Sequence, residues 1–133
     1  MEVEAVLEEE KRESNKRMIE TILIKYLTEQ NIESIGGNVY AEVPAKDIPD
    51  NYLVISKLGS SEQDGIYHAS VSIDSISNKS LLEAMTINEA VREVMETFAE
   101  TEAVHSCKFN SDFNNTNTAT REYRYEAVFD FYM

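Results

Sequence analysis

Cysteine, basic residues and long apolar runs are scarce in this chain of 133 residues. The single cysteine, Cys107, excludes an intrachain disulfide and a zinc cluster of paired cysteines. No apolar run has the length of a membrane span, and residues 1–4 have neither the basic nor the apolar part of a signal peptide. We therefore expect an intracellular protein as it is made.

The charge balance is strongly acidic, because 12 Lys and Arg residues stand against 25 Asp and Glu residues and the net charge is −13. A surface of this sign repels phosphate backbones and anionic lipids, which argues against binding of nucleic acid or membrane through a basic patch. Two interpretations stay open. The acidic residues keep the protein soluble, or they line a channel through which DNA passes without binding.

The chain has the length of one domain, since two would each be too small for a self-sufficient core. Residues 1–17 are dominated by charge, with the run Glu8, Glu9, Glu10, Lys11, Arg12 and then Lys16, Arg17. We interpret residues 1–17 as a charged N-terminal extension, either solvated or a partner-binding arm, and residues 18–133 as a single domain.

Two apolar stripes with helical spacing predict two helices. The first helix runs from Met18 to about Asn31, and its stripe consists of Ile19, Ile22, Leu23, Tyr26 and Leu27. The second begins at Ser80, which can form a capping box with Glu83, and continues to Phe98. Both helices can cover one face of a sheet.

Five segments have the pattern of strands: 38–43, 52–55, 67–74, 103–109 and 121–133. The apolar run 52–55 is typical of a central strand covered on both faces, whereas the alternation in 67–74 predicts one wet face. Turns or loops are predicted at 36–37, 44–49, 59–65 and 110–120. The expected fold is α+β, with two helices packed on one face of a mostly antiparallel sheet in the order α-β-β-β-α-β-β.

The last predicted strand, 121–133, sorts its side chains onto two different faces. Apolar and aromatic side chains point one way: Tyr123, Tyr125, Ala127, Phe129 and Phe131. The other face carries Arg124, Glu126, Val128, Asp130 and Tyr132. The first set fits a core under the helices, whereas the second must face water or a polar partner.

The residues that could act in catalysis or bind a metal do not have the sequence spacing of a known catalytic or metal site. His105 and Cys107 share a strand face and could meet His68, but a fourth ligand at informative spacing is lacking. The glycines at 36–37 lack the spacing of a phosphate loop. A serine-type triad stays open, but neither histidine lies in a nucleophile-elbow setting. We predict no catalytic residue, no cofactor and no metal.

The carboxylates Glu89, Glu93 and Glu96 share one side of the second helix and are interpreted as a solvated face. Phe113 stands out because its surroundings are polar, so it either folds back as a lid on the core or is presented to a partner. The candidate interface residues are Phe113, Asn114, Asn115, Asp64, Arg124, Glu126, Asp130 and Tyr132.

The order of elements and the residues Val39-Tyr40, Val43-Pro44, Ile48-Pro49 and 52–55 resemble a known family. It is the tail terminator family of long-tailed phages and prophages, also called tail completion or tail-to-head joining proteins. The similarity covers roughly 18–133, and the charged extension departs from compact members.

The resemblance implies a structural protein of the virion that forms a hexameric ring and catalyses no reaction. Such a ring caps the tail tube, docks it onto the head connector protein and lets DNA pass through its channel. It implies a location in the host cytoplasm during assembly and then in the virion tail. Association would use the sheet surface, an edge strand and loops. The loops 59–65 and 110–120, with Phe113 as anchor, are the candidate contacts to the tube protein.

Two other classes of function stay open. One is a small acidic protein-binding module that forms a dimer and mimics DNA for a basic partner. The other is a small enzyme with a concave pocket around His68 or His105. The oligomeric state distinguishes the binding module, which forms a dimer, from a tail protein, which forms a ring. The surroundings of the two histidines test the enzyme hypothesis.

Overall fold

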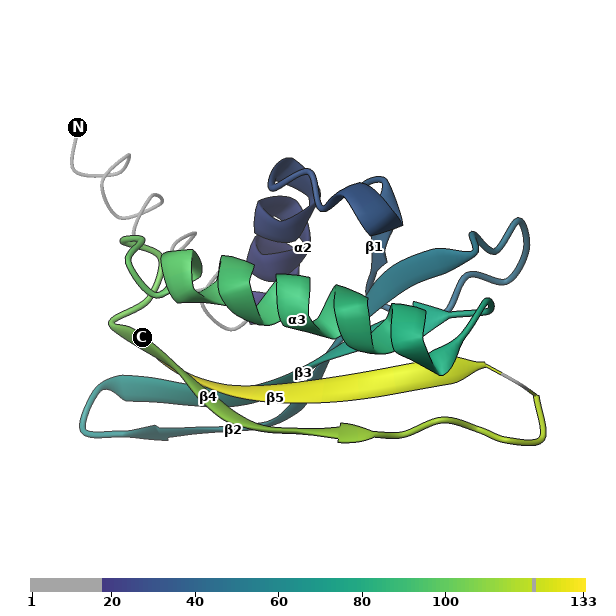
Figure 1. The fold of residues 1–133 in the computed structure, drawn as a ribbon. Helices are drawn as coiled ribbons and strands as arrows, with labels where there is room; N and C mark the ends of the chain where they lie inside the picture. The colour runs from purple at the N-terminus through teal and green to yellow at the C-terminus, as the bar shows by residue number, and fades with distance from the viewer. Residues whose placement is uncertain (1–17, 121) are drawn as a thin grey trace.

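The computed structural model describes residues 18–120 and 122–133, so the predictions for residues 1–17 lie outside the described part of the chain. The elements, labelled as in Figure 1, are α2 (Ile19–Glu29), η1 (Glu33–Ile35), β1 (Val39–Tyr40), β2 (Asn51–Gln63), β3 (Ile66–Ser77), α3 (Leu81–Phe98), β4 (Ser106–Asn114) and β5 (Tyr123–Tyr132). Apart from the short 3-10 helix η1, this is the predicted order, and the α+β fold is confirmed.

The five strands form one sheet in the order β1-β2-β3-β5-β4. β1 runs parallel to β2, and every other pair is antiparallel. Figure 1 shows α2 and α3 on the same side of this sheet, as predicted. The turn between β2 and β3 and the connection between β4 and β5 lie at opposite ends of the sheet (Figure 1).

The main core lies between the two helices and the sheet. Its largest fully buried side chains include Ile19, Leu23, Leu27, Leu53, Ile55, Ile73, Ile87, Phe98 and Phe131. The Phe98 ring lies 4.9 Å from the Tyr26 ring of α2 and 5.8 Å from the Phe131 ring of β5. Both predicted helical stripes are therefore confirmed, and apolar burial of this kind is the main stabilising term of the fold.

Hydrogen bonds of two polar side chains, Ser80 and Asn51, fix where α3 begins. The Ser80 side chain accepts a hydrogen bond from the Glu83 backbone N–H at 3.1 Å, which is one half of the predicted capping box. The Glu83 carboxylate accepts a bond from the amide of Asn51 at 2.7 Å, and the same amide donates to the Ser34 carbonyl at 3.1 Å. One buried side chain thus links α3, β2 and η1.

Two predicted boundaries in the first half of the sheet are wrong. The strand predicted at 38–43 is limited to Val39–Tyr40, because β1 has one neighbour and pairs with it only at Leu53 and Val54. The predicted loop 59–65 is strand up to Gln63. Its polar residues continue the β2 ladder, and only Asp64 and Gly65, both at positive φ, form the turn.

The second half of the sheet also differs from the prediction. β4 begins at Ser106, not at residue 103, and continues to Asn114, so the predicted loop 110–120 shortens at its start. β5 spans Tyr123–Tyr132 within the predicted 121–133, with an isolated bridge between Asn117 and Glu122 before it. Cross-strand pairing with β5 supplies the hydrogen bonds of β4 whatever the polarity of its side chains.

Among the described residues, no helix or strand covers the other side of the sheet, which we call the open face (Figure 1). It carries His68, Ser70, Ser72, Asp74 and Ile76 from β3, and Arg124, Glu126, Val128, Asp130 and Tyr132 from β5. The predicted alternation of β3 and β5 is confirmed, but only some of the side chains on the predicted wet face are exposed to solvent. Ser72 and Asp74 are buried between the side chains of the neighbouring strands.

Candidate functional site

The strand register arranges the open face in rows that cross the sheet. One row runs from Val54 through Asp74 and Glu126 to Phe113, so that it crosses β2, β3, β5 and β4. The neighbouring row, nearer the C-terminal end of β3, consists of Tyr52, Ile76 and Arg124. Phe113, which was predicted in a loop, therefore lies in a strand beside Glu126.

Phe113 is 43% exposed and lies on the open face, away from the helices. The interpretation as a lid on the core is therefore wrong. Of the predicted interface residues, Arg124, Glu126, Asp130 and Tyr132 share this face with it.

A charged network occupies one end of the open face. Arg124 donates from Nη1 to Asp74 Oδ2 at 2.8 Å and from Nη2 to Glu122 Oε1 at 2.9 Å. Asp74 is only 4% exposed, and its carboxyl is hydrogen-bonded to that of Glu126, which requires a proton on one of the two groups. Burial and then the neighbouring Glu126 carboxylate raise the pKa of Asp74 to about 7, although Arg124 acts in the opposite direction.

A small apolar cluster lies against this network. It consists of Tyr52, Val54 and Ile76, with Tyr40 packed against them. Burial and then the charge of Glu122 raise the pKa of Tyr52. The run 52–55 is thus buried on both faces, as predicted: Leu53 and Ile55 belong to the main core, and Tyr52 and Val54 belong to this small cluster.

A second polar group surrounds Asp130 near the other end of the open face. Ser70 donates to Asp130 Oδ1 at 2.6 Å, and Asn110 donates to Oδ2 at 2.9 Å. The Ser70 bond is the main reason why the pKa of Asp130 is lowered. His68 Nε2 lies 3.3 Å from Oδ1, and its ring packs 4.8 Å from that of Tyr132.

The group around Asp130 does not have the geometry of a serine-type triad. In a triad the imidazole lies between the hydroxyl and the carboxylate. Here the Ser70 hydroxyl donates directly to the carboxylate, and His68 contacts the same oxygen from the side. The contacts order a surface and do not activate a nucleophile.

The residues considered for a metal are divided between the two faces of the sheet. His68 lies on the open face, whereas Cys107 packs against the main core under α3. Within residues 18–120 and 122–133, no group of three or more His, Cys, Asp and Glu side chains is placed to hold a metal ion. Burial raises the pKa of the Cys107 thiol to about 12, so it stays protonated and unreactive.

The remaining predicted interface residues lie at the end of β4 and in the connections. Asn115 Nδ2 donates to Glu126 Oε1 at 3.3 Å and so belongs to the open face. Asn114 accepts bonds from the backbone N–H and the hydroxyl of Thr116, at 3.0 and 2.6 Å, and shapes the start of the connection to β5. Asp64 lies in the β2–β3 turn at the opposite end of the sheet, so the structure does not bring it together with Asn114 and Asn115.

Asp74 and Glu122 are site residues that the sequence prediction missed. The alternation of β3 placed Asp74 on the polar face, but its partner Arg124 lies 50 residues later in the chain. Only the register between β3 and β5 shows that the two side chains meet.

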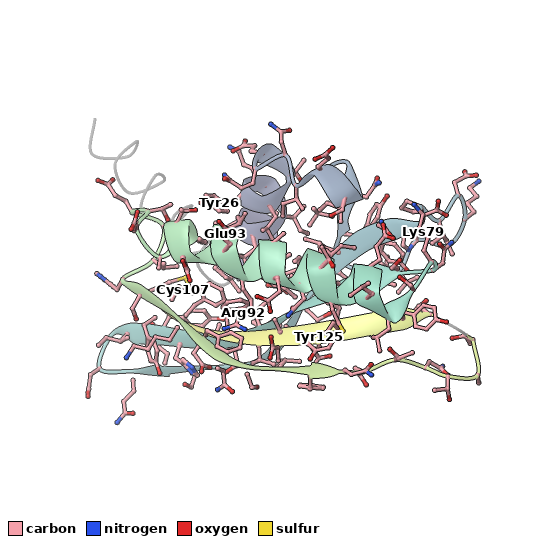
Figure 2. The ribbon with its side chains drawn as sticks, in the orientation of Figure 1. Tyr26, Lys79, Arg92, Glu93, Cys107 and Tyr125 are labelled. Carbon is pink, nitrogen blue, oxygen red and sulfur yellow. The ribbon has the colours of Figure 1, made fainter. Side chains whose placement is uncertain are left out.

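The helix face has a cleft of about 260 Å³ between α3 and β4. Arg92 lies over the Phe109 ring, 3.9 Å from its centroid, and its Nη1 is 3.3 Å from Asp112 Oδ2. Figure 2 shows Arg92 between α3 and the sheet and Glu93 on the outer side of the helix. Glu89, Glu93 and Glu96 are exposed, as predicted for a solvated face.

Two strands carry a β-bulge where they form an edge of the sheet among the described residues: β2, beyond its short pairing with β1, and β4. The register shifts between Lys57 and Gly59 in β2 and between Phe109 and Ser111 in β4. Bulges of this kind hinder the addition of another strand to a sheet. The open face is therefore a better candidate for a contact surface than either edge.

Comparison of the chain with protein-family models and with curated proteins found no match. Neither α2 nor α3 is both long and apolar enough to cross a membrane. The candidate site consequently rests on the geometry of the open face.

Proposed function

We propose that this chain is a tail terminator of a long-tailed phage or prophage. Copies of the chain assemble into a ring, with six as the expected number, and the ring caps the tail tube and joins it to the head connector. The observation that carries the proposal is the open face, where charged groups and an exposed aromatic ring stand on a rigid sheet with no covering layer among the described residues.

The chemistry of the open face fits contact with a protein. It combines a partly buried ion-pair network around Arg124 with the exposed rings of Phe113 and Tyr132. Aromatic and arginine side chains are the residues that most often anchor protein interfaces. The bulges in β2 and β4 direct the contact toward the face and away from the edges.

The shape of the sheet suits a protein that lies between two others. The turn at Asp64 and Gly65 and the end of β4 at Asn114 are at opposite ends of the strands (Figure 1). In a ring with its strands inclined toward the axis, one end would meet the tube and the other the connector. A net charge of −13 suits a channel along which DNA slides without binding.

Light scattering combined with negative-stain electron microscopy tests the proposal. The purified chain is measured alone and together with tail tubes assembled from the cognate tube protein. Rings in solution, or density that closes one end of the tubes, are the expected results. A stable dimer that ignores the tubes would overturn the proposal and favour the acidic protein-binding module.

Phe113→Ala and Asn115→Ala test the contact residues. Both side chains are exposed at the end of the sheet near the β4–β5 connection, so their loss should weaken capping without unfolding the chain. If both variants cap tubes as the unmodified chain does, this end of the sheet does not contact the tube.

A further inference from the structure

We infer that Asp74 and Glu126 form a proton-controlled switch on the open face: one shared proton holds the Glu126 side chain against β3, and its loss lets that side chain turn toward water. The two residues are directly opposite each other on β3 and β5. Their carboxyls are hydrogen-bonded, and such a bond exists only while one of them carries a proton. The inference goes beyond the proposed function, because it describes a response of the isolated chain.

Asp74 is the fixed member of the pair. It is 4% exposed, and its Oδ2 accepts a bond of 2.8 Å from Arg124 Nη1. Arg124 is held in turn by Glu122, through a bond of 2.9 Å. Loss of the proton gives Asp74 a full charge and strengthens its bond to Arg124. The Asp74 side chain therefore keeps its place whether or not the pair holds a proton.

Glu126 is the member that can move. Its side chain is partly exposed, and it also accepts a bond of 3.3 Å from the exposed amide of Asn115. A long bond at an exposed position contributes little to the hold on Glu126. Two carboxylates directly opposite each other repel, and Glu126 is the one with access to water. We expect it to turn away from Asp74 once the proton is lost.

The groups around the pair place the switch near neutral pH. The titratable and charged side chains near it are Tyr40 of β1, Tyr52 of β2, Glu122 before β5 and Arg124 of β5, whereas Phe113 of β4 and Asn115 are uncharged. Burial, and then the charge of Glu126, raises the pKa of Asp74 to about 7, although Arg124 acts in the opposite direction. The proton is therefore lost near neutral pH and not in acid, where an ordinary aspartate releases it.

The switch changes the surface beside Phe113. With the proton in place, Glu126 lies against Asp74, and the row that ends in Phe113 carries one negative charge fewer. Without the proton, a free carboxylate stands on β5 next to an aromatic ring that is 43% exposed. An unpaired carboxylate is costly to bury, so a partner that covers this row would favour the protonated pair.

Nuclear magnetic resonance of the full chain, with no partner present, tests the inference. The carboxyl carbons of Asp74 and Glu126 are followed from about pH 5 to about pH 9, together with the nuclear Overhauser contacts between the two side chains. We expect both carboxyl signals to move in one common step near pH 7, and the contacts to be lost above it. Contacts that persist unchanged to the highest pH, or two signals that move in unrelated steps, would overturn the inference.

Glu126→Gln is the decisive variant, because its amide donates to the Asp74 carboxylate without a shared proton. The contacts between the two side chains should then persist across the whole pH range. Asp74→Asn makes the reciprocal change and should remove the step near pH 7 from the Glu126 signal. The control Glu96→Gln, at an exposed position of α3, should behave as the unmodified chain does.

Two outcomes for the variants contradict the switch. One is a loss of contacts with rising pH in Glu126→Gln equal to that in the unmodified chain. The other is a step near pH 7 that persists in the Glu126 signal of Asp74→Asn. The titration needs neither rings nor tubes, so its failure and that of the proposed function are distinguishable.

Discussion

At the scale of single residues, Asp74 is the least ordinary group in the molecule. Folding moves its carboxyl from water into a position between Arg124 and Glu126, where it is nearly inaccessible. Burial and the adjacent negative charge both favour the protonated form, and the Arg124 bond does not fully offset them. Stability should therefore respond to the protonation of this one side chain.

Asp74→Asn should change the pH dependence of stability. The pKa of Asp74 is raised from 3.8 to about 7, so between these values the folded chain holds a proton that the unfolded chain has released. The contribution of Asp74 to the free energy of unfolding then falls as pH rises through this window, by up to about 1.4 kcal/mol per pH unit. In urea denaturation at a series of pH values, the free energy of unfolding of Asp74→Asn should increase relative to that of the unmodified chain as the pH rises. Parallel curves for the two proteins would contradict the account, and Asp64→Asn, in the exposed turn, is the matched control.

Two phenylalanines should differ sharply when each is shortened to alanine. Phe131 is fully buried against Phe98, whereas Phe113 is exposed on the open face. Phe131→Ala should lower the free energy of unfolding by about 3–5 kcal/mol through lost burial and a cavity. Phe113→Ala should change it by roughly 0.5 kcal/mol or less, as is usual for surface positions. Chemical denaturation measures both, and a large loss for Phe113→Ala would mean that this ring belongs to the core.

At the scale of elements, the helices could be predicted from the sequence more closely than the strands. The stripes of α2 and α3 and the cap at Ser80 are local signals, and a helix satisfies its backbone within itself. The segments 59–63 and 110–114 are polar apart from Phe113 and have no alternating apolar pattern, yet they are strand because β3 and β5 supply their hydrogen bonds. The contact of Asp74 with Arg124 depends on register, which no local pattern encodes.

The cap of α3 can be tested by Ser80→Ala. The Ser80 side chain accepts the Glu83 N–H, and its removal leaves that donor without this partner at the start of the helix. The free energy of unfolding should fall by about 1 kcal/mol. Thermal and urea unfolding measure the change. Ser60→Ala, at an exposed position of β2, should be near neutral, and an equal loss in both variants would argue that the cap contributes nothing of its own.

At the scale of the whole molecule, the two sides of the sheet have different roles. The helix side holds the main core, and the open side holds the charged network and the exposed rings. Hydrogen bonds between neighbouring strands hold the charged side chains of the open side, whereas the Phe113 and Tyr132 rings remain exposed. The central claim is that this open face joins copies of the chain into a ring that caps a tail tube.

The measurement that tests this claim most directly is electron microscopy of tail tubes mixed with the chain or with Val128→Arg. Val128 lies in the middle of the open face, opposite Ser72 and Ser111, so an arginine there should block close contact with another surface. Thr86→Arg makes the same change of charge on the exposed side of α3 and serves as the control. Thermal unfolding establishes that both variants are folded. The account predicts capped tubes with the unmodified chain and with Thr86→Arg, and open tubes with Val128→Arg. Equal capping by all three proteins, or no capping by any of them, would contradict it.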